Sequence, residues 1–553
     1  MAYDLVIRDG EVIDGSGLPR FRADLGVVGD RIAKIGRIAE RGAREIDAGG
    51  LAVTPGFIDG HTHMDAQINW DPLCSSSCHQ GVTTVVMGNC GFTLAPSRKE
   101  NRGWVVRNLE RAEDINAAAM AQGIAWGWET FPEYLDVLDT LPKALNHAVY
   151  VGHSALRTWA MGERAWESTA DADELAAMTG QLQAALAAGA MGLSTSQSVS
   201  HETSDDRPVA SRVGSFDELA ALVRTLGDAG KGVFEIALGG RVPTELEDLA
   251  AETRVPMTFG VGAVGSMDWR SQLALLDRTA ARGGRMIGQT HSRGITILLS
   301  FASQLPFDRL PTWLEFRKQP LAEQERLLRT DAGLRARLVH AAHHEAYPRA
   351  LSGEARRPKW PLIQVRTGPL PPYASLAELS ERQSRDPVEI MIDLALESPG
   401  LSQLFIQQLA AFPEDELLQV LQHPRTVMTF SDSGAHVSQM SDCSIQTYFL
   451  AYWVRQRQAF TLEEAIRMIT MTPAATWGFN DRGLLREGMK ADVNVFDPDA
   501  ILPQTPKVAH DLPGGARRFT QGADGIRATL VNGQVLMENG EHTGALPGRL
   551  LRQ

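Results

Sequence analysis

The chain has 553 residues, 43% of them hydrophobic, so it can bury a large core and should form one large domain with a smaller one. Its 54 Lys and Arg residues are outnumbered by 67 Asp and Glu residues, and the net charge of −13 excludes the basic field that nucleic acids or anionic membranes require. The amino terminus, MAYDLVIRDG, has no apolar signal region, and no apolar run is long enough to span a bilayer, so we expect a cytoplasmic protein without a membrane partner.

The cysteine content argues against a disulfide-stabilised or zinc-finger protein. Four cysteines in so long a chain cannot form a disulfide framework. Cys74 and Cys78 lack the second pair of ligands that a structural zinc site would need. Each cysteine is therefore judged singly, and Cys90 is the one that we consider for chemistry.

Both ends of the chain are rich in predicted β-hairpins. Gly29-Asp30 joins two of the apolar runs near the amino terminus, and Asp9-Gly10 separates two others in the same way. Near the carboxyl end, Asn532-Gly533 tolerates the positive φ of a tight hairpin turn. The runs are residues 5–7, 12–13, 25–28, 32–35, 492–496, 528–531 and 534–536.

Between the two ends, short apolar strands alternate with helical patterns, which is typical of a parallel β/α architecture. One helix carries an apolar stripe at Leu175, Met178, Leu182 and Leu186, and another begins with Ser215 and Glu218 in capping-box spacing. Eight strands favour closure into a barrel. We expect them at residues 57–59, 82–87, 148–151, 192–194, 233–236, 257–259, 286–289 and 427–430.

Residues 295–360 interrupt this alternation with a polar, helical segment after the seventh predicted strand. Loops after barrel strands lie on the face where active sites form, so the insertion could be a lid over a substrate. It could equally be a contact between subunits, and we expect a homo-oligomer.

His61 and His63 follow the first predicted strand, within FIDGHTH. The period of two in an extended chain places both imidazoles on the same side. Two neutral imidazoles at the end of a barrel strand suit Zn²⁺, which can activate a water molecule at its open position. Two solvated loop histidines are the alternative, and the combination of strand, spacing and chain position favours metal binding.

Asp432 follows the eighth predicted strand, within FSDSGAH. Barrel closure would bring it beside the first strand and therefore beside the histidine pair. A carboxylate there could bind the metal, accept a proton from water and pass it to a leaving amine. A lone Asp in this setting is more often a helix N-cap, but its place opposite the histidines makes Asp432 our candidate catalytic base.

Cys90 ends the second predicted strand, in a segment of small residues that lets the backbone approach a site closely. A thiolate at this position could bind a metal ion, which stabilises the deprotonated sulfur. A small buried hydrophobic residue is the competing interpretation, and the sequence pattern alone leaves the two even.

Several segments together resemble the amidohydrolase superfamily, specifically its N-acyl-D-amino-acid deacylase (D-aminoacylase) branch. They are YDLVIRDGEVIDGSG, PGFIDGHTH, GVTTVVMGNCGFTLAP, FSDSGAH, GMKADVNVFDPD and VNGQV, and they run from the first strands to the last. The resemblance implies a metal-bearing (β/α)8 barrel at residues 54–480. It also implies a small composite β-sandwich domain formed by residues 1–53 and 481–553.

The resemblance further implies a metal site in which His61, His63, Cys90 and Asp432 match the family pattern. Two further histidines expected after strands five and six are missing from residues 232–237 and 256–261. Glu235 and His291 could replace them, although Glu235 could instead bind a neighbouring Arg and His291 a substrate carbonyl. No lysine lies centrally in the strands to form a carboxylated bridge. We expect one zinc ion and leave open a weaker second.

Other polar residues near the predicted strand ends are candidates for substrate binding. His153 follows the third strand, His291 follows the seventh, and an arginine could bind a substrate carboxylate. Arginines on loops are usually solvated, so at most one or two should contact substrate. The arginine candidates are Arg157, Arg293 and Arg366.

The residues and the resemblance together predict a zinc-dependent hydrolase that cleaves the amide bond of a small N-acyl amino acid or similar compound with metal-activated water. A cyclic amidohydrolase of the hydantoinase or dihydroorotase kind is an alternative that the motifs do not separate. A non-catalytic protein with the same fold is a third, and the retention of His61, His63 and Asp432 argues against it.

Overall fold

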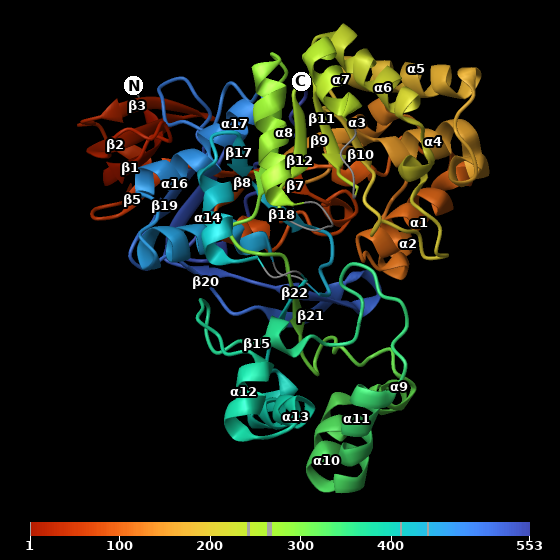
Figure 1. The fold of residues 1–553 in the computed structure, drawn as a ribbon. Helices are drawn as coiled ribbons and strands as arrows, with labels where there is room; N and C mark the ends of the chain where they lie inside the picture. Colours follow the sequence, from red (N-terminus) through yellow and green to blue (C-terminus); the bar gives the residue numbers. More distant parts are fainter. Residues whose placement is uncertain (1, 240–243, 263–267, 410–411, 440–441) are drawn as a thin grey trace.

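The computed structural model of the chain describes residues 2–239, 244–262, 268–409, 412–439 and 442–553. At its centre lies a curled parallel sheet of eight strands with helices around it (Figure 1). The strands neighbour one another in chain order, and all eight expected strands are confirmed. They are β6 (Phe57–Asp59), β8 (Val82–Met87), β9 (Asn146–Gly152), β10 (Gly192–Ser196), β11 (Val233–Ala237), β12 (Met257–Gly260), β13 (Met286–Thr290) and β17 (Thr426–Met428).

A short additional pairing joins the two ends of this sheet. β7 (His61–Thr62) continues from β6, β18 (Phe430–Ser433) continues from β17, and the two run parallel with Phe430 opposite His61. The backbone N–H of Gly60 also donates a hydrogen bond to Thr429 Oγ1. The arrangement is consistent with a TIM-like barrel, and it brings the segment after the last strand beside the segment after the first.

The helices between the strands bury one apolar side against the sheet. In α5, Met178, Leu182 and Leu186 are buried, which confirms the predicted stripe. Ser215 caps α6 as predicted, but the Glu218 carboxylate does not complete a capping box because it binds other side chains. The helices on this side are α3 (Phe131–Thr140), α4 (His153–Met161), α5 (Ala172–Ala188), α6 (Phe216–Ala229), α7 (Glu245–Thr253) and α8 (Trp269–Ala281).

Further helices pack around the rest of the barrel, two of them against β6 and β17. None of the helices in the described part of the chain is long and apolar enough to cross a membrane. These further helices are α1 (Arg102–Ala112), α2 (Ala117–Gly123), α14 (Glu414–Gln422), α15 (Ile445–Tyr448), α16 (Leu462–Ile469) and α17 (Met471–Trp477).

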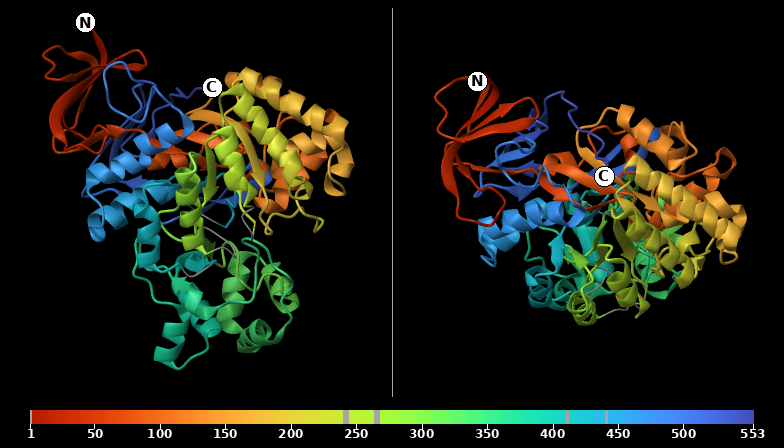
Figure 2. Two further views of the ribbon diagram at one scale, coloured as in Figure 1. Left: turned by 45° about the horizontal axis from the view of Figure 1, so that its top comes forward. Right: turned by 90° about the horizontal axis from the view of Figure 1, so that it is seen from above.

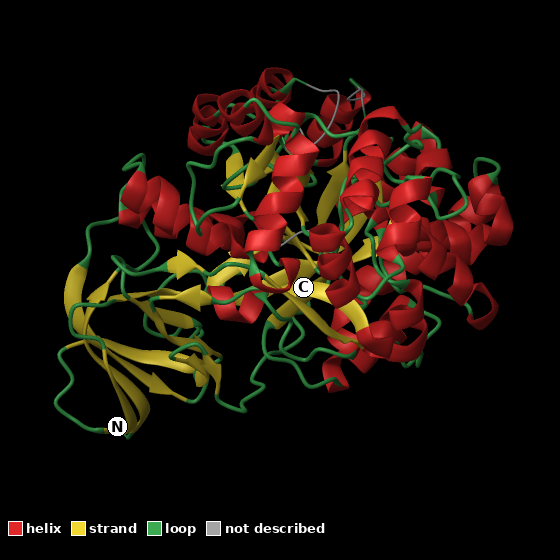
Figure 3. Ribbon diagram, turned by 90° about the horizontal axis from the view of Figure 1, so that it is seen from below, coloured by secondary structure: helices red, strands yellow, loops and turns green. Residues whose placement is uncertain are grey.

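Both chain ends contribute to a nine-stranded sheet beside the barrel (Figure 3). β5 pairs with β19, which joins the amino-terminal strands to the carboxyl-terminal ones. The expected hairpin around Asp9-Gly10 is wrong, because residues on both sides of it belong to β1, which has an irregularity there and a φ of 60° at Asp9. The strands are β1 (Tyr3–Val12), β2 (Phe21–Val28), β3 (Arg31–Gly36), β4 (Gly42–Asp47), β5 (Ala52–Pro55), β19 (Val493–Phe496), β24 (Ile526–Val531), β25 (Gln534–Glu538) and β26 (Glu541–His542).

The other two predicted hairpins are confirmed. β2 and β3 pair with Val28 opposite Arg31 around Gly29-Asp30. β24 and β25 pair around Asn532-Gly533, whose φ angles are 46° and 79°. Four short strands of the carboxyl-terminal region stay outside the large sheet: β20 (Leu502–Pro503), β21 (Lys507–Leu512), β22 (Ala516–Thr520) and β23 (Ala523–Asp524).

The insertion after β13 forms a separate lobe that projects from the barrel (Figures 1 and 2). It extends beyond the expected end at residue 360, because its hydrophobic core continues from Ile295 to Phe405. A three-stranded sheet in the order β14, β16, β15 forms its base. The elements are β14 (Thr296–Leu299), α9 (Pro311–Arg317), α10 (Leu321–Thr330), α11 (Ala332–His344), β15 (Ile363–Val365), α12 (Leu376–Gln383), α13 (Pro387–Glu397) and β16 (Phe405–Gln408).

Candidate metal centre

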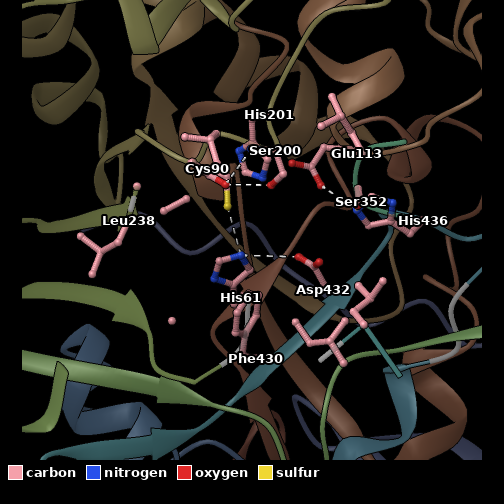
Figure 4. A pocket seen from close by; sticks show the side chains of 18 of the residues that line it. His61, Cys90, Glu113, Ser200, His201, Leu238, Ser352, Phe430, Asp432 and His436 are labelled. Carbon is pink, nitrogen blue, oxygen red and sulfur yellow. Dashed lines mark hydrogen bonds and ion pairs between the residues drawn. The ribbon is translucent and has the colours of Figure 1, made fainter. Parts of the chain in front are cut away.

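Four of the predicted ligands converge at the carboxyl end of the barrel strands. Figure 4 shows three of them, His61, Cys90 and Asp432. His61 Nε2 lies 3.5 Å from Cys90 Sγ and 3.6 Å from Asp432 Oδ1. His63 Nε2 lies 3.0 Å from the same Asp432 oxygen. The pairing of β7 with β18 is the cause of this proximity, since it places Asp432 beside the histidine pair.

Gln289 fixes the orientation of the His61 ring through its Nδ1 atom. Its Nδ1 lies 2.6 Å from Gln289 Oε1, and the Gln289 amide nitrogen donates to Thr258 Oγ1 at 3.0 Å. The amide oxygen therefore accepts the Nδ1–H of His61 and leaves the lone pair on Nε2, which faces Cys90 and Asp432. Metal-binding histidines are commonly oriented by such a partner on the other ring nitrogen.

His63 and Asp432 form a close ion pair that leaves the hydrogen bonds of the His63 ring incomplete. Both ring nitrogens of His63 are buried and make no hydrogen bond with acceptable geometry among the described residues, although Nε2 is near Asp432. Buried polar atoms without partners are rare unless a ligand or ion completes them. The donor set of imidazole, thiolate and carboxylate is the one that Zn²⁺ prefers, so these residues fit a metal ion.

Cys90 is held toward the site by its backbone. It lies in a short 3₁₀ turn, Asn89–Gly91, with a φ of 56°, a left-handed conformation that is uncommon for a residue with a side chain. Its N–H donates to Glu235 Oε2 at 2.7 Å. Glu235 therefore lies at the edge of the site, where it orients the Cys90 turn. It does not belong to any of the three-residue ligand groups found among the described residues.

Two further potential ligands were not predicted. Glu113, which follows α1, and His201, in the loop after β10, bring their ligand atoms within 4.8 Å of Cys90 Sγ and of each other. Glu113 Oε2 is also 3.6 Å from His63 Nε2. In the sequence, Glu113 looks like part of a charged surface helix. His201 had a usable signal, because it follows a barrel strand.

The charges in this cluster shift one another's proton affinities. Burial alone would lower the pKa of His63, but the Glu113 and Asp432 carboxylates raise it to about 9. Burial would raise the pKa of Asp432, but His63 and His61 hold it well below its usual range. Burial lowers the pKa of His61 to about 3 and raises the pKa of Glu113. His61 is thus neutral and Asp432 ionised, the forms in which each can bind a metal.

His291 lies behind the cluster. Its ring centroid is 5.0 Å from that of Phe430, which in turn packs 4.0 Å from the His61 ring. Both His291 nitrogens are buried without a hydrogen-bond partner in the described part of the chain. His291 belongs to none of the ligand groups formed by the described residues. No contact within the ranges that the structure describes supports its predicted role in binding metal or substrate.

His153 and Arg157 lie in another part of the molecule. His153 Nε2 is 2.8 Å from Glu218 Oε1, and Arg157 Nη1 pairs with the same carboxylate. Both side chains are 1% exposed or less, and neither lines the cavity at the metal centre. Their contacts join α4 to α6, and they offer no support for the predicted substrate binding.

A cavity of about 320 Å³ opens onto the cluster. Its lining includes His61, Cys90, Glu235 and Asp432, and also Arg356 from the insertion. Arg293 and Arg366, the other predicted carboxylate ligands, line a different cavity. Among the described residues, the arginine that lines the metal cavity is therefore one that the sequence did not single out, and the lobe contributes it.

Comparison with known proteins agrees with the geometry of the site. Residues 44–537 match the sequence profile of the amidohydrolase family. The chain is 29% identical over 561 residues to a D-aminoacylase of Alcaligenes xylosoxydans xylosoxydans, covering 99% of this chain and 97% of that one. It is 30% identical over 566 residues to an N-acyl-D-glutamate deacylase of the same organism, covering 100% and 96%.

A solved structure shares the whole fold. An N-acyl-D-glutamate deacylase from Bordetella bronchiseptica, complexed with zinc and a phosphonate inhibitor that mimics the tetrahedral intermediate, superimposes with a TM-score of 0.65 at 26% identity. The match covers 100% of both chains.

Proposed function

The chain belongs to the amidohydrolase family, and we propose that it hydrolyses the amide bond of N-acyl amino acids with a zinc ion bound by His61, His63, Cys90 and Asp432. The observation that carries this proposal is the convergence of the ligand atoms at the end of a barrel, where both buried ring nitrogens of His63 lack a hydrogen-bond partner in the described part of the chain. The deacylases to which the chain is similar act on N-acyl-D-amino acids, which favours open-chain substrates over cyclic amides.

In this mechanism a bound zinc ion would polarise the substrate carbonyl and lower the pKa of an attacking water molecule. Asp432 accepts the proton of that water and later donates it to the departing amine nitrogen. Its low pKa reflects its contacts with His63 and His61. Gln289 keeps His61 in the tautomer that binds metal, and Glu235 keeps the Cys90 turn in place.

We also propose that Arg356 binds the carboxylate of the substrate. It lines the metal cavity, and its Nε and Nη2 groups donate to the backbone carbonyls of Glu354 and Ser352, which aim the side chain. A guanidinium group has further N–H donors that can bind a carboxylate. This gives the insertion a role in specificity, as predicted for a lid. Arg356 replaces the three predicted candidates, Arg157, Arg293 and Arg366.

A second, weaker metal ion would bind to Cys90, Glu113 and His201. Ser196 Oγ lies 2.7 Å from His201 Nδ1, which orients the ring so that Nε2 remains for a ligand. Glu113 is 2% exposed, and its Oε1 has no hydrogen-bond partner among the described residues. This set would compensate for the histidines that are missing after strands five and six.

We also propose a domain organisation for the chain. Residues 54–480 would be the catalytic domain, and residues 1–53 with 481–553 would form a β-sandwich domain that supports it. We further propose that the protein forms a homo-oligomer, that it is cytoplasmic and that its metal ion is zinc.

The test is a parallel assay on one metal-quantified sample, with N-acetyl-D-amino acids and their L enantiomers beside hydantoin and dihydroorotate. We expect release of a free amino acid that stops on chelation and returns with zinc. Turnover of the cyclic amides alone would refute the substrate class. Stoichiometric zinc without any turnover would favour the non-catalytic alternative.

A further inference from the structure

A second cavity lies beside the metal cavity and has a lining of its own. Its volume is about 300 Å³, and among the described residues none that lines it also lines the metal cavity. The β14–β16 pair separates the two. Thr296 and Gln408 face each other across the pair and line the second cavity, whereas their neighbours Ile295 and Leu409 line the metal cavity. The alternation of side chains along a strand explains this division.

Arg366, which follows β15, carries an uncompensated charge into the second cavity. Arg366 is only 8% exposed, and its Nε–H donates a hydrogen bond to the carbonyl of Gly368 at 3.1 Å. The charged or titratable groups that act on it are Tyr373, Arg293 and Tyr448, none of them a carboxylate. The segments outside the described ranges contain no Asp or Glu that could supply one.

The other charges of this cavity are already matched. Arg293 Nη2 lies 2.7 Å from Asp442 Oδ1, and its guanidinium stacks over the Tyr448 ring at 5.1 Å. Glu414 accepts a hydrogen bond from the Tyr452 hydroxyl and pairs with Arg457 at 3.0 Å. With Arg457 counted, three arginines stand against two carboxylates, and among the described residues Arg366 is the one of the three that has no carboxylate partner. Burying a charge without a partner is costly, and an anion bound in the cavity would offset that cost.

We propose that this cavity binds a small organic monocarboxylate with an aromatic or apolar body. The planar guanidinium of Arg366 can hold a carboxylate through two parallel N–H groups, and a single excess charge favours a monoanion over a phosphate dianion. Tyr373, Tyr448 and Trp453 provide flat apolar walls for the rest of the molecule. The volume suits a ligand of roughly ten non-hydrogen atoms.

This site is independent of the proposed hydrolysis, because it uses no residue of the metal cavity. The probe is phenylacetate, titrated calorimetrically into the metal-loaded, full-length protein. Phenylacetamide, which has the same shape without the charge, is the control ligand. We expect phenylacetate to bind and phenylacetamide to bind at least about tenfold more weakly, the effect of losing one charge-assisted contact.

Two arginine variants locate the binding. Arg366→Met should weaken phenylacetate binding at least about tenfold, and Arg366→Lys should weaken it less, because charge remains without the two-pronged geometry. Arg356→Met, a matched change in the metal cavity, should leave phenylacetate affinity unaltered. If Arg366→Met does not fold, the Lys variant carries the test.

Three results would overturn the proposal. The first is the absence of heat with phenylacetate in the wild-type protein. The second is unchanged affinity in both Arg366 variants, and the third is loss of binding in Arg356→Met, which would assign the carboxylate to the metal cavity. Inorganic phosphate that binds in an Arg366-dependent manner, with phenylacetate failing to compete, would refute the choice of a monocarboxylate. Because none of these measurements uses turnover, their failure is distinguishable from failure of the proposed hydrolase function.

Discussion

Asp432→Asn separates the charge of this residue from its shape. Asp432 adopts a φ of 59°, a left-handed conformation that Asn tolerates as well as Asp does. The substitution therefore preserves the backbone beside His63 and removes only the carboxylate that would accept a proton. Loss of a positioned general base typically slows a reaction about 10²- to 10⁴-fold, which corresponds to roughly 3–5 kcal/mol of barrier.

The metal should remain in this variant, because three of the four proposed ligands, His61, His63 and Cys90, are untouched. The assay measures kcat for an N-acyl amino acid together with zinc content on the same sample. Asp206→Asn is the matched control, since Asp206 also has a left-handed φ, of 62°, but its side chain is 74% exposed. That control should change neither quantity.

Two outcomes would contradict this reasoning about Asp432. Near-normal turnover in Asp432→Asn would remove it from the proton transfer. Loss of zinc along with turnover would make it chiefly a metal ligand. In Asp432→Ala, by contrast, backbone strain is added to the loss of the carboxylate, so this variant should be less stable than Asp432→Asn by a thermal melt.

Three further predictions concern metal content, packing and pH. Cys90→Ser should lower the zinc content per protein chain, measured by atomic absorption. An unchanged zinc content would favour the alternative interpretation, that Cys90 is a small buried hydrophobic residue. Gly60→Ala should cost about 1–3 kcal/mol of unfolding free energy and reduce turnover, because an added Cβ would lie 2.0 Å from the Trp477 ring, whereas Gly103→Ala, with open space around it, should not. Burial would raise the pKa of Glu218, but His153 and Arg157 lower it to about 2. The ionised carboxylate therefore stabilises the folded protein at pH values above the unfolded pKa of about 4.3, and this stabilisation is lost as the pH falls from there toward 2. Urea melts of Glu218→Gln against wild type should therefore converge over that range, and a constant difference would contradict the assignment.

The order of elements could be predicted from the sequence because it depends on local patterns. Eight short apolar runs separated by helical stretches identified the barrel strands, and Asn532-Gly533 identified its hairpin. The same local pattern failed at Asp9-Gly10, where a turn-like pair sits inside one strand, since pairing with β2 on both sides overrides the turn preference. The lobe was placed correctly but ended too early, because β16 pairs with β14 from far along the chain and β15 pairs with β16.

The candidate metal site likewise contains residues that the sequence reveals and residues that only the tertiary structure reveals. His61, His63, Cys90 and Asp432 could be found because each follows a strand, and barrel closure alone brings such positions together. Glu113 could not be assigned, because only the packing of α1 carries it to Cys90. His201 follows β10 and could have been found by the same signal as the other four residues.

The arginines show most clearly what tertiary structure decided. Arg157, Arg293, Arg356 and Arg366 are indistinguishable as loop or helix arginines in the sequence. Their surroundings differ: Arg157 is neutralised by Glu218, Arg293 by Asp442, and Arg356 faces the metal cavity. Arg366 alone among these four lacks a carboxylate or the metal cavity beside it. The sequence by itself determined which side chains could do chemistry, whereas the long-range packing determined which charge each would meet, because electrostatic partners are chosen by distance in space and not along the chain.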